Sequence, residues 1–124
     1  MNLKKVMISL LLVVALSVLS VAPAFAAARI KDGDSFTWEY EDEVLSCKDA
    51  YGKPVRGFVS KGDDVYYLNK DGIVKTGWVK YLGDWYYFYS DTDDVEEKLI
   101  GTMAKDEWID NYYVNSKGIM TKTR

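Results

Sequence analysis

The chain has 124 residues, enough for one small domain, and carries a formal net charge of −3 with no histidine and one cysteine. This acidic balance disfavours nucleic acids and anionic membranes as partners, because both attract basic patches. The lack of histidine removes the commonest general base and the commonest metal ligand. A single cysteine cannot form an intramolecular disulfide, so packing must stabilise the fold.

Residues 1–26 have the pattern of a secretory signal peptide. Lys4 and Lys5 form a basic start, Val6–Val21 is an apolar run, and Ala24-Phe25-Ala26 supplies the small-x-small pattern that signal peptidase recognises. The apolar run is shorter than the roughly 20 residues of a membrane span. We therefore predict cleavage near residue 26 and a protein that is secreted, extracellular or associated with the cell wall. An uncleaved anchor is the alternative.

After a short N-terminal segment, 27–36, the chain repeats itself every twenty residues. Trp38, Phe58 and Trp78 fall at this spacing, and the tyrosine pairs 66–67 and 86–87 keep it. A ten-residue insertion, DTDDVEEKLI, interrupts the pattern before Trp108 and the pair 112–113 resume it. Such a period indicates an array in which each unit buries a face on the next. We predict a repeat module over 37–124, made of a degenerate repeat, 37–56, and the repeats 57–76, 77–106 and 107–124.

Each unit is predicted to be a β-hairpin. GWVKY and DWYYFY are short alternating runs rich in aromatic and β-branched residues, with Leu82-Gly83-Asp84 as the turn and strands at Gly77–Tyr81 and Trp85–Tyr89. In the last unit Asp110-Asn111 joins the strands as a two-residue turn. No amphipathic helix follows the signal peptide. Because an isolated hairpin is marginal in water, we expect an all-β fold, a solenoid of stacked β-hairpins.

The run GWVKYLGDWYY, followed by a Gly-x-Met step and by EWIDNYYVNSKG, resembles the choline-binding (cell-wall-binding) repeat family. It is also similar to the glucan-binding repeats of glucosyltransferases and to the receptor-binding repeats of large secreted toxins. The resemblance covers Gly57 to Met120 and reaches Thr37–Arg56 only through the register. It implies stacked hairpins with exposed ligand sites between consecutive hairpins, and a role in holding proteins at the bacterial surface.

The resemblance also implies which residues form a ligand site. The family's aromatic cage uses the Trp after Gly, the Trp before Tyr-Tyr, and a Tyr of the following hairpin. In this sequence these residues are Trp78, Trp85 and Tyr113, with Tyr112 as the candidate if the register slips. Rings arranged around a gap attract a quaternary ammonium group through cation–π interactions, and Trp stacks equally well on a sugar face.

The preceding junctions match the cage less well. The second junction, between the repeats 57–76 and 77–106, would use Phe58, Val65 and Tyr87. This cage is degenerate, because Val65 has no π face. The first junction would use Trp38, Leu45 and Tyr67, and it is poorer again.

Other residues are interpreted as packing or surface. We expect Tyr66, Tyr86 and Phe88 to pack between hairpins, and Cys47 to be a buried, inert thiol. The acidic run 91–97 lacks the glycine and the ligand spacing of an EF-hand loop, so we expect a solvated loop tip. We expect no metal, no cofactor and no catalytic residue.

The sequence thus predicts a small secreted, non-catalytic module that binds a cell-wall polymer, either choline-decorated teichoic acid or a glucan. The alternative is a structural or interaction protein without a small ligand, whose repeats pair with another repeat-bearing protein or with a second copy as a homodimer. The acidic charge argues for no nucleic acid, and the cleaved signal peptide for no membrane attachment.

Overall fold

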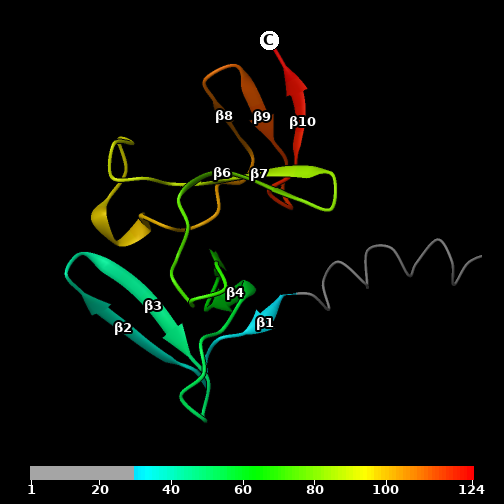
Figure 1. Cartoon of the computed structure of the whole chain (residues 1–124). Coiled ribbons are helices and arrows are strands. Elements are labelled where there is room, and N and C mark those ends of the chain that lie inside the picture. Colours follow the sequence, from blue (N-terminus) through cyan, green and yellow to red (C-terminus); the bar gives the residue numbers. More distant parts are fainter. Residues whose placement is uncertain (1–29) are drawn as a thin grey trace, which may run out of the picture. The chain divides into compact units, whose positions relative to one another are not determined.

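The computed structural model of the protein describes residues 30–124, so the predicted signal peptide and residues 27–29 lie outside the described residues. Residues 30–124 form short β-strands and one 3₁₀ helix, which confirms the expected all-β fold of β-hairpins (Figure 1). Within this range no helix is long and apolar enough to cross a membrane. The elements are β1 Lys31–Asp32, β2 Thr37–Glu41, β3 Val44–Lys48, β4 Gly57–Lys61, β5 Asp64–Leu68, β6 Gly77–Tyr81, β7 Asp84–Phe88, η1 Glu97–Leu99, β8 Glu107–Ile109, β9 Tyr112–Val114 and β10 Met120–Thr123.

The hairpins β2–β3, β4–β5, β6–β7 and β8–β9 each turn over two residues. In β6–β7 the last ladder pair is Tyr81 with Asp84, so Asp84 belongs to the strand and not to the predicted three-residue turn. Leu82 and Gly83 both have positive φ, 51° and 90°, which is the backbone of a type I′ turn. This turn type matches the twist of the strands. The strand β7 consequently starts and ends one residue before the predicted 85–89.

Three of the loops that follow the hairpins share one hydrogen-bonding pattern. The side-chain oxygen of Asn69 accepts hydrogen bonds from the backbone N–H groups of Asp71 and Ile73, at 2.9 and 3.1 Å. The N–H of Gly72, at φ 76°, donates to the Asn69 carbonyl. Asp49 and Asn115 make the corresponding contacts in the other two loops of this kind. An Asx side chain thus fixes each of these loops locally.

Between β7 and β8 the ten-residue insertion takes the place of this hydrogen-bonding pattern. Tyr89 stands where the twenty-residue register would place an Asn. Asp93 anchors the insertion instead, because its carboxylate accepts hydrogen bonds from the Tyr87 hydroxyl at 2.7 Å and from the Ser90 N–H at 2.8 Å. One member of the acidic run therefore points inward, so the description of the run as a solvated loop tip was incomplete.

Consecutive hairpins bury apolar side chains in three clusters. The middle hairpin, β4–β5, uses both of its faces: Val59 and Tyr66 belong to the first cluster, while Phe58 and Val65 belong to the second. The register explains this division, because Val59 pairs with Tyr66 and Phe58 pairs with Tyr67 on the opposite face. The third cluster holds Tyr87, Ala104 and Val114. The hairpins β4–β5 and β6–β7 are therefore each a wall between two small cores.

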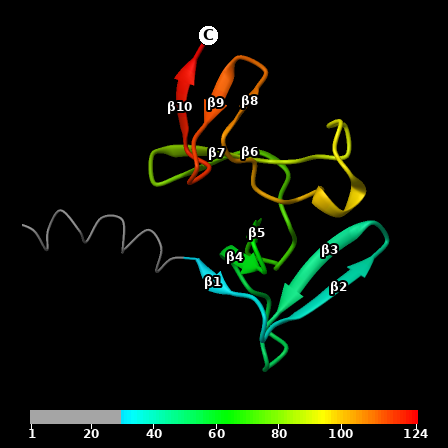
Figure 2. The ribbon, with the colours of Figure 1, turned by 180° about the vertical axis from the view of Figure 1, so that it is seen from behind.

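The residues expected to pack do so. Tyr66 and Phe88 are buried, and Tyr86 is half-buried against the second cluster. Cys47 is 1% exposed, and burial raises the pKa of its thiol, as expected for an inert cysteine. Two added strands flank the hairpins, since β1 pairs with β4 in parallel and β10 pairs with β9 antiparallel (Figure 2).

Candidate ligand-binding site

The register of β6–β7 gathers the candidate site on one face of this hairpin. Trp78 pairs with Tyr87, and Lys80 pairs with Trp85, so these four side chains share a face. The rings of Trp78 and Tyr87 meet edge to face with their centroids 5.0 Å apart. Trp85 is 39% exposed, so its ring remains available to solvent.

The following hairpin contributes Tyr112. Its ring centroid lies 5.6 Å from that of Trp78, with an interplanar angle of 77°, and its side chain remains exposed. Trp78, Tyr87 and Tyr112 thus form a group of three rings with Trp85 further along the same hairpin face. This arrangement offers several π faces and edges within one region, as recognition of an ammonium group requires.

Tyr113, the first choice for the third ring, lies on the other face of its hairpin. It pairs with Trp108 across the β8–β9 ladder, and the two ring centroids are 5.4 Å apart. Its neighbour Tyr112 pairs with Ile109 and points back to the preceding hairpin. Because successive residues of a strand alternate faces, only one of the two tyrosines can reach Trp78.

The contact between Trp78 and Tyr112 is one of three equivalent contacts. At the first junction Trp38 meets Tyr66 at 5.1 Å, and at the second Phe58 meets Tyr86 at 4.9 Å. The first aromatic residue of each hairpin therefore packs on the first tyrosine of the next pair. Neither Tyr67 nor Tyr87 fills that role; Tyr87 packs in the third cluster on its own hairpin's Trp78.

The second junction is closed by packing. Phe58 is 6% exposed, and the rings of Tyr67, Tyr81, Tyr86 and Phe88 surround it at 4.9 to 6.2 Å. Val65 is buried in the same cluster. These side chains form a core, and no ring face of Phe58 remains open to a ligand.

The first junction contains a cation from the chain itself. The Nζ atom of Lys61 lies 5.4 Å from the centroid of the Trp38 ring. Lys61 is the last residue of β4, and the equivalent residue of the next hairpin, Tyr81, covers Phe58 in the same way. Sequence reasoning did not identify this role of Lys61.

The last hairpin, β8–β9, is shorter than the other three. Its strands β8 and β9 have three residues each, whereas β4 to β7 have five, so no residue corresponds to Lys61 or Tyr81. The outer rings of this hairpin are covered by β10 and by the residue after it: Lys122 Nζ lies 5.2 Å from the Tyr113 centroid, and the Arg124 guanidinium lies 4.3 Å from that of Trp108. The length of the hairpin was the signal in the sequence that distinguishes the third junction.

Negative charges lie near Tyr87, one of the three rings. Burial raises the pKa of the Tyr87 hydroxyl, and the hydrogen bond to Asp93 and the charges of Asp93 and Asp110 raise it further. The same carboxylates would favour a cation beside Trp78. Against this, Lys80 Nζ lies 5.8 Å from the centroid of Trp85 and presents a like charge.

Comparisons with known proteins identify the repeats. Residues 102–124 match the family described as choline-binding repeat, and residues 57–74 and 76–91 match the family described as cell wall binding repeat. No curated protein matches the chain.

Solved structures with the same arrangement include choline binding protein F of Streptococcus pneumoniae. It is 32% identical over 68% of this chain, with a TM-score of 0.55, and the match spans 26% of that protein. The choline binding domain of Spr1274 from the same organism is 29% identical, with a TM-score of 0.56, over 68% of this chain and 93% of that domain. A truncated alternansucrase from Leuconostoc mesenteroides shares the fold at 21% identity and a TM-score of 0.50, over 70% of this chain and 7% of that enzyme.

Proposed function

Because this chain belongs to the choline-binding, or cell-wall-binding, repeat family, we propose that residues 37–124 are a non-catalytic module that binds choline on a polymer of the bacterial surface. The ammonium group is bound at Trp78, Tyr87 and Tyr112, with Trp85 as a further wall. The module holds the secreted protein at the cell wall.

The observation that carries this proposal is the meeting of the Trp78, Tyr87 and Tyr112 rings beside the exposed ring of Trp85. The aromatic residue that corresponds to Trp78 contacts Lys61 at the first junction and Tyr81 at the second, whereas Tyr112 and Trp85 remain 41% and 39% exposed at the third. Two carboxylates, Asp93 and Asp110, lie near enough to Tyr87 to raise its pKa. Rings together with nearby negative charge favour a quaternary ammonium over a neutral group.

One cage supports only weak binding. Each ring contributes about 0.5–2 kcal/mol, and association has its own entropic cost, so a single site has roughly millimolar affinity. A polymer that carries many choline groups compensates through repeated rebinding and through several protein copies on one strand. We therefore expect the protein to be retained on intact cell walls more strongly than free choline binding suggests.

The test is a calorimetric titration of choline into wild type, Trp85→Ala and Tyr112→Ala. Both side chains are partly exposed, so both variants should keep the fold. Loss of one ring should weaken choline about tenfold. Tyr51→Ala is the matched control, because Tyr51 is 89% exposed and is not one of the rings of the candidate cage. Equal affinities in all four proteins would rule out this cage.

A glucan is the second candidate, favoured by the exposed ring of Trp85, on which a sugar face can stack. An isomaltooligosaccharide titrated into the same variants separates the two candidates. A glucan site should bind the sugar, lose affinity for it in Trp85→Ala, and show no binding of choline. If wild type binds neither ligand, the hypothesis of an interaction protein without a small ligand replaces both. The measurement is then whether the protein binds a repeat-bearing partner or associates with itself.

A further inference from the structure

The ten-residue insertion is joined to the candidate cage through the side chain of Asp93. Its Oδ2 atom accepts a hydrogen bond from the Tyr87 hydroxyl at 2.7 Å, and it accepts two more from the Ser90 N–H and hydroxyl at 2.8 and 3.2 Å. The Tyr87 ring in turn meets the ring of Trp78, with the two centroids 5.0 Å apart. A carboxylate of the insertion is thus bonded directly to one of the rings of the cage.

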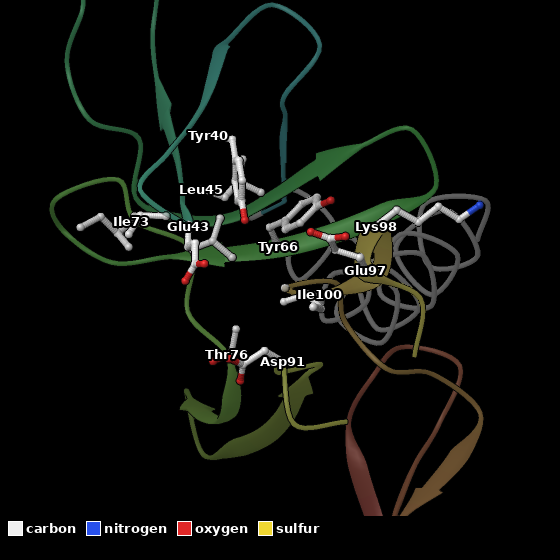
Figure 3. A pocket seen from close by; sticks show the side chains of 13 residues that line it. Tyr40, Glu43, Leu45, Tyr66, Ile73, Thr76, Asp91, Glu97, Lys98 and Ile100 are labelled. Atoms are coloured by element: carbon white, nitrogen blue, oxygen red, sulfur yellow. The ribbon is translucent and has the colours of Figure 1, made fainter. Parts of the chain in front are cut away.

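Other carboxylates of the insertion lie elsewhere. Asp91 and Glu97 line a hollow between the insertion, the first hairpin and the loop after β5, and Figure 3 shows both among its lining residues. None of the rings of the cage lines that hollow. A tyrosine hydroxyl has one proton to donate, and the proton of Tyr87 goes to Asp93. The link between insertion and cage is therefore a property of Asp93 and not of the acidic run as a whole.

Asp93 has hydrogen-bond donors around it but no cation. Its side chain is half-buried, and no salt bridge within residues 30–124 involves it. A hydrogen bond from a hydroxyl to a carboxylate is charge-assisted, and it polarises the donor. In Tyr87 this polarisation moves electron density from the O–H bond toward the oxygen and the ring. The ring face, which is already the negative part of an aromatic side chain, becomes more attractive to a cation.

The position of Tyr87 makes this effect persistent. Tyr87 is 9% exposed, so it forms the inner wall of the cage, where water screens charges less than at the surface. Burial raises the pKa of its hydroxyl, and the hydrogen bond to Asp93 raises this pKa further. The hydroxyl therefore keeps its proton at neutral pH and continues to donate it to the carboxylate.

We propose that Asp93 is a specificity-determining residue, which makes the cage prefer a cation to a neutral group of the same shape and acts through the Tyr87 hydroxyl. This inference rests on the proposed function of the cage. The carboxylate attracts an ammonium group directly and also polarises the ring that the ammonium group meets. A neutral group gains from neither effect, because its contact with the rings depends on shape and apolar area. The insertion thereby favours choline over a glucan.

The test compares choline with 3,3-dimethylbutan-1-ol, in which carbon replaces the charged nitrogen and the shape is kept. Both are titrated, with detection by NMR, into wild type, Asp93→Asn, Tyr87→Phe and the double variant. Asn keeps a carbonyl that can accept from Tyr87 and Ser90, so the loop should hold while the charge is lost. We expect Asp93→Asn to weaken choline about two- to fivefold, the range for a partly exposed charge, and to leave the alcohol unchanged. In the Tyr87→Phe background the same substitution should cost less choline affinity.

Asp91→Asn is the matched control, because it removes the same charge from the same insertion but lines the other hollow. The proposal is overturned if Asp91→Asn weakens choline as much as Asp93→Asn, if Asp93→Asn weakens the alcohol as much as choline, or if its cost is undiminished in Tyr87→Phe.

Tyr87→Phe alone decides the case if Asp93→Asn does not fold. It keeps the ring and loses the hydroxyl, so the ratio of choline affinity to alcohol affinity should fall, and an unchanged ratio overturns the proposal. Wild type that binds no choline overturns the cage itself. Wild type that binds choline, with equal affinity in Asp93→Asn, overturns only the role of Asp93.

Discussion

Lys80 is positioned to limit cation binding at the candidate cage. Its Nζ atom is 5.8 Å from the centroid of Trp85, where a bound ammonium would meet a like charge. We predict that Lys80→Gln tightens choline binding about two- to fivefold, as measured by calorimetry. Lys53→Gln makes the same change in net charge in an exposed loop. If that variant gains as much affinity, total charge and not the local contact is the cause.

Leu82 carries conformational strain in a turn. It is 64% exposed and has a φ of 51°, a left-handed conformation that costs a branched side chain about 1–2 kcal/mol. Asn tolerates this conformation and favours type I′ turns before Gly. We predict that Leu82→Asn raises the free energy of unfolding by about 1 kcal/mol in urea denaturation. Leu82→Ala lacks the side-chain amide that lets Asn favour the left-handed conformation, so it should gain much less. Equal gains would point to the removed apolar surface.

At the scale of residues, the candidate site was proposed from the sequence and its ring contacts come from the structure. The resemblance to the repeat family names Trp78 and Trp85, and the structure places both on one face of a single hairpin. It left Tyr112 and Tyr113 as alternatives, since the choice depends on which strand face meets the preceding hairpin. The cover of Trp38 by Lys61 depends on the reach of a long flexible side chain, which no spacing reports.

Among the elements, the end of the insertion is sensitive to a small change at Gly101, the residue that follows it. Gly101 combines a φ of 90° with the close approach to Val74, so Gly101→Ala meets both strain and overlap. We predict a loss of about 2–4 kcal/mol in the free energy of unfolding. Gly77→Ala is the matched control, because Gly77 has a φ of 82° but nothing within 4 Å of an added Cβ.

That control should lose only the strain component, about 1–2 kcal/mol. Equal losses in the two variants would mean that the insertion does not press on the second repeat.

The hairpins were predictable as elements, and the insertion was not. Alternating aromatic and β-branched residues with a turn glycine predict the strands β6 and β7 to within one residue, because local chemistry determines a two-residue hairpin. The insertion has no such pattern. Its conformation depends on Asp93, which bonds Tyr87, and on Gly101, which meets the second repeat. These are tertiary contacts between residues with no shared register.

For the whole molecule, the shared hairpins predict cooperative unfolding. The β4–β5 hairpin belongs to two cores, so the first core cannot open without exposing part of the second. We predict that thiol labelling of Cys47, in the first core, and tryptophan fluorescence report the same urea midpoint. Val65→Ala, in the second core, should shift both midpoints together. Separate midpoints would show that the repeats unfold independently.

The two-residue turns have a consequence for how the chain acquires its structure. In the four hairpins each strand meets its partner after two intervening residues, and the hydrogen bonds between repeats link neighbours, such as Cys47 with Gly72 and Met103 with Val65. Such short sequence separations favour rapid folding, because little chain entropy is lost before each contact forms. With a single cysteine, no step waits for thiol oxidation. A chain of this kind can fold progressively from its N-terminal side. Each folded hairpin then provides the apolar face on which the next hairpin packs.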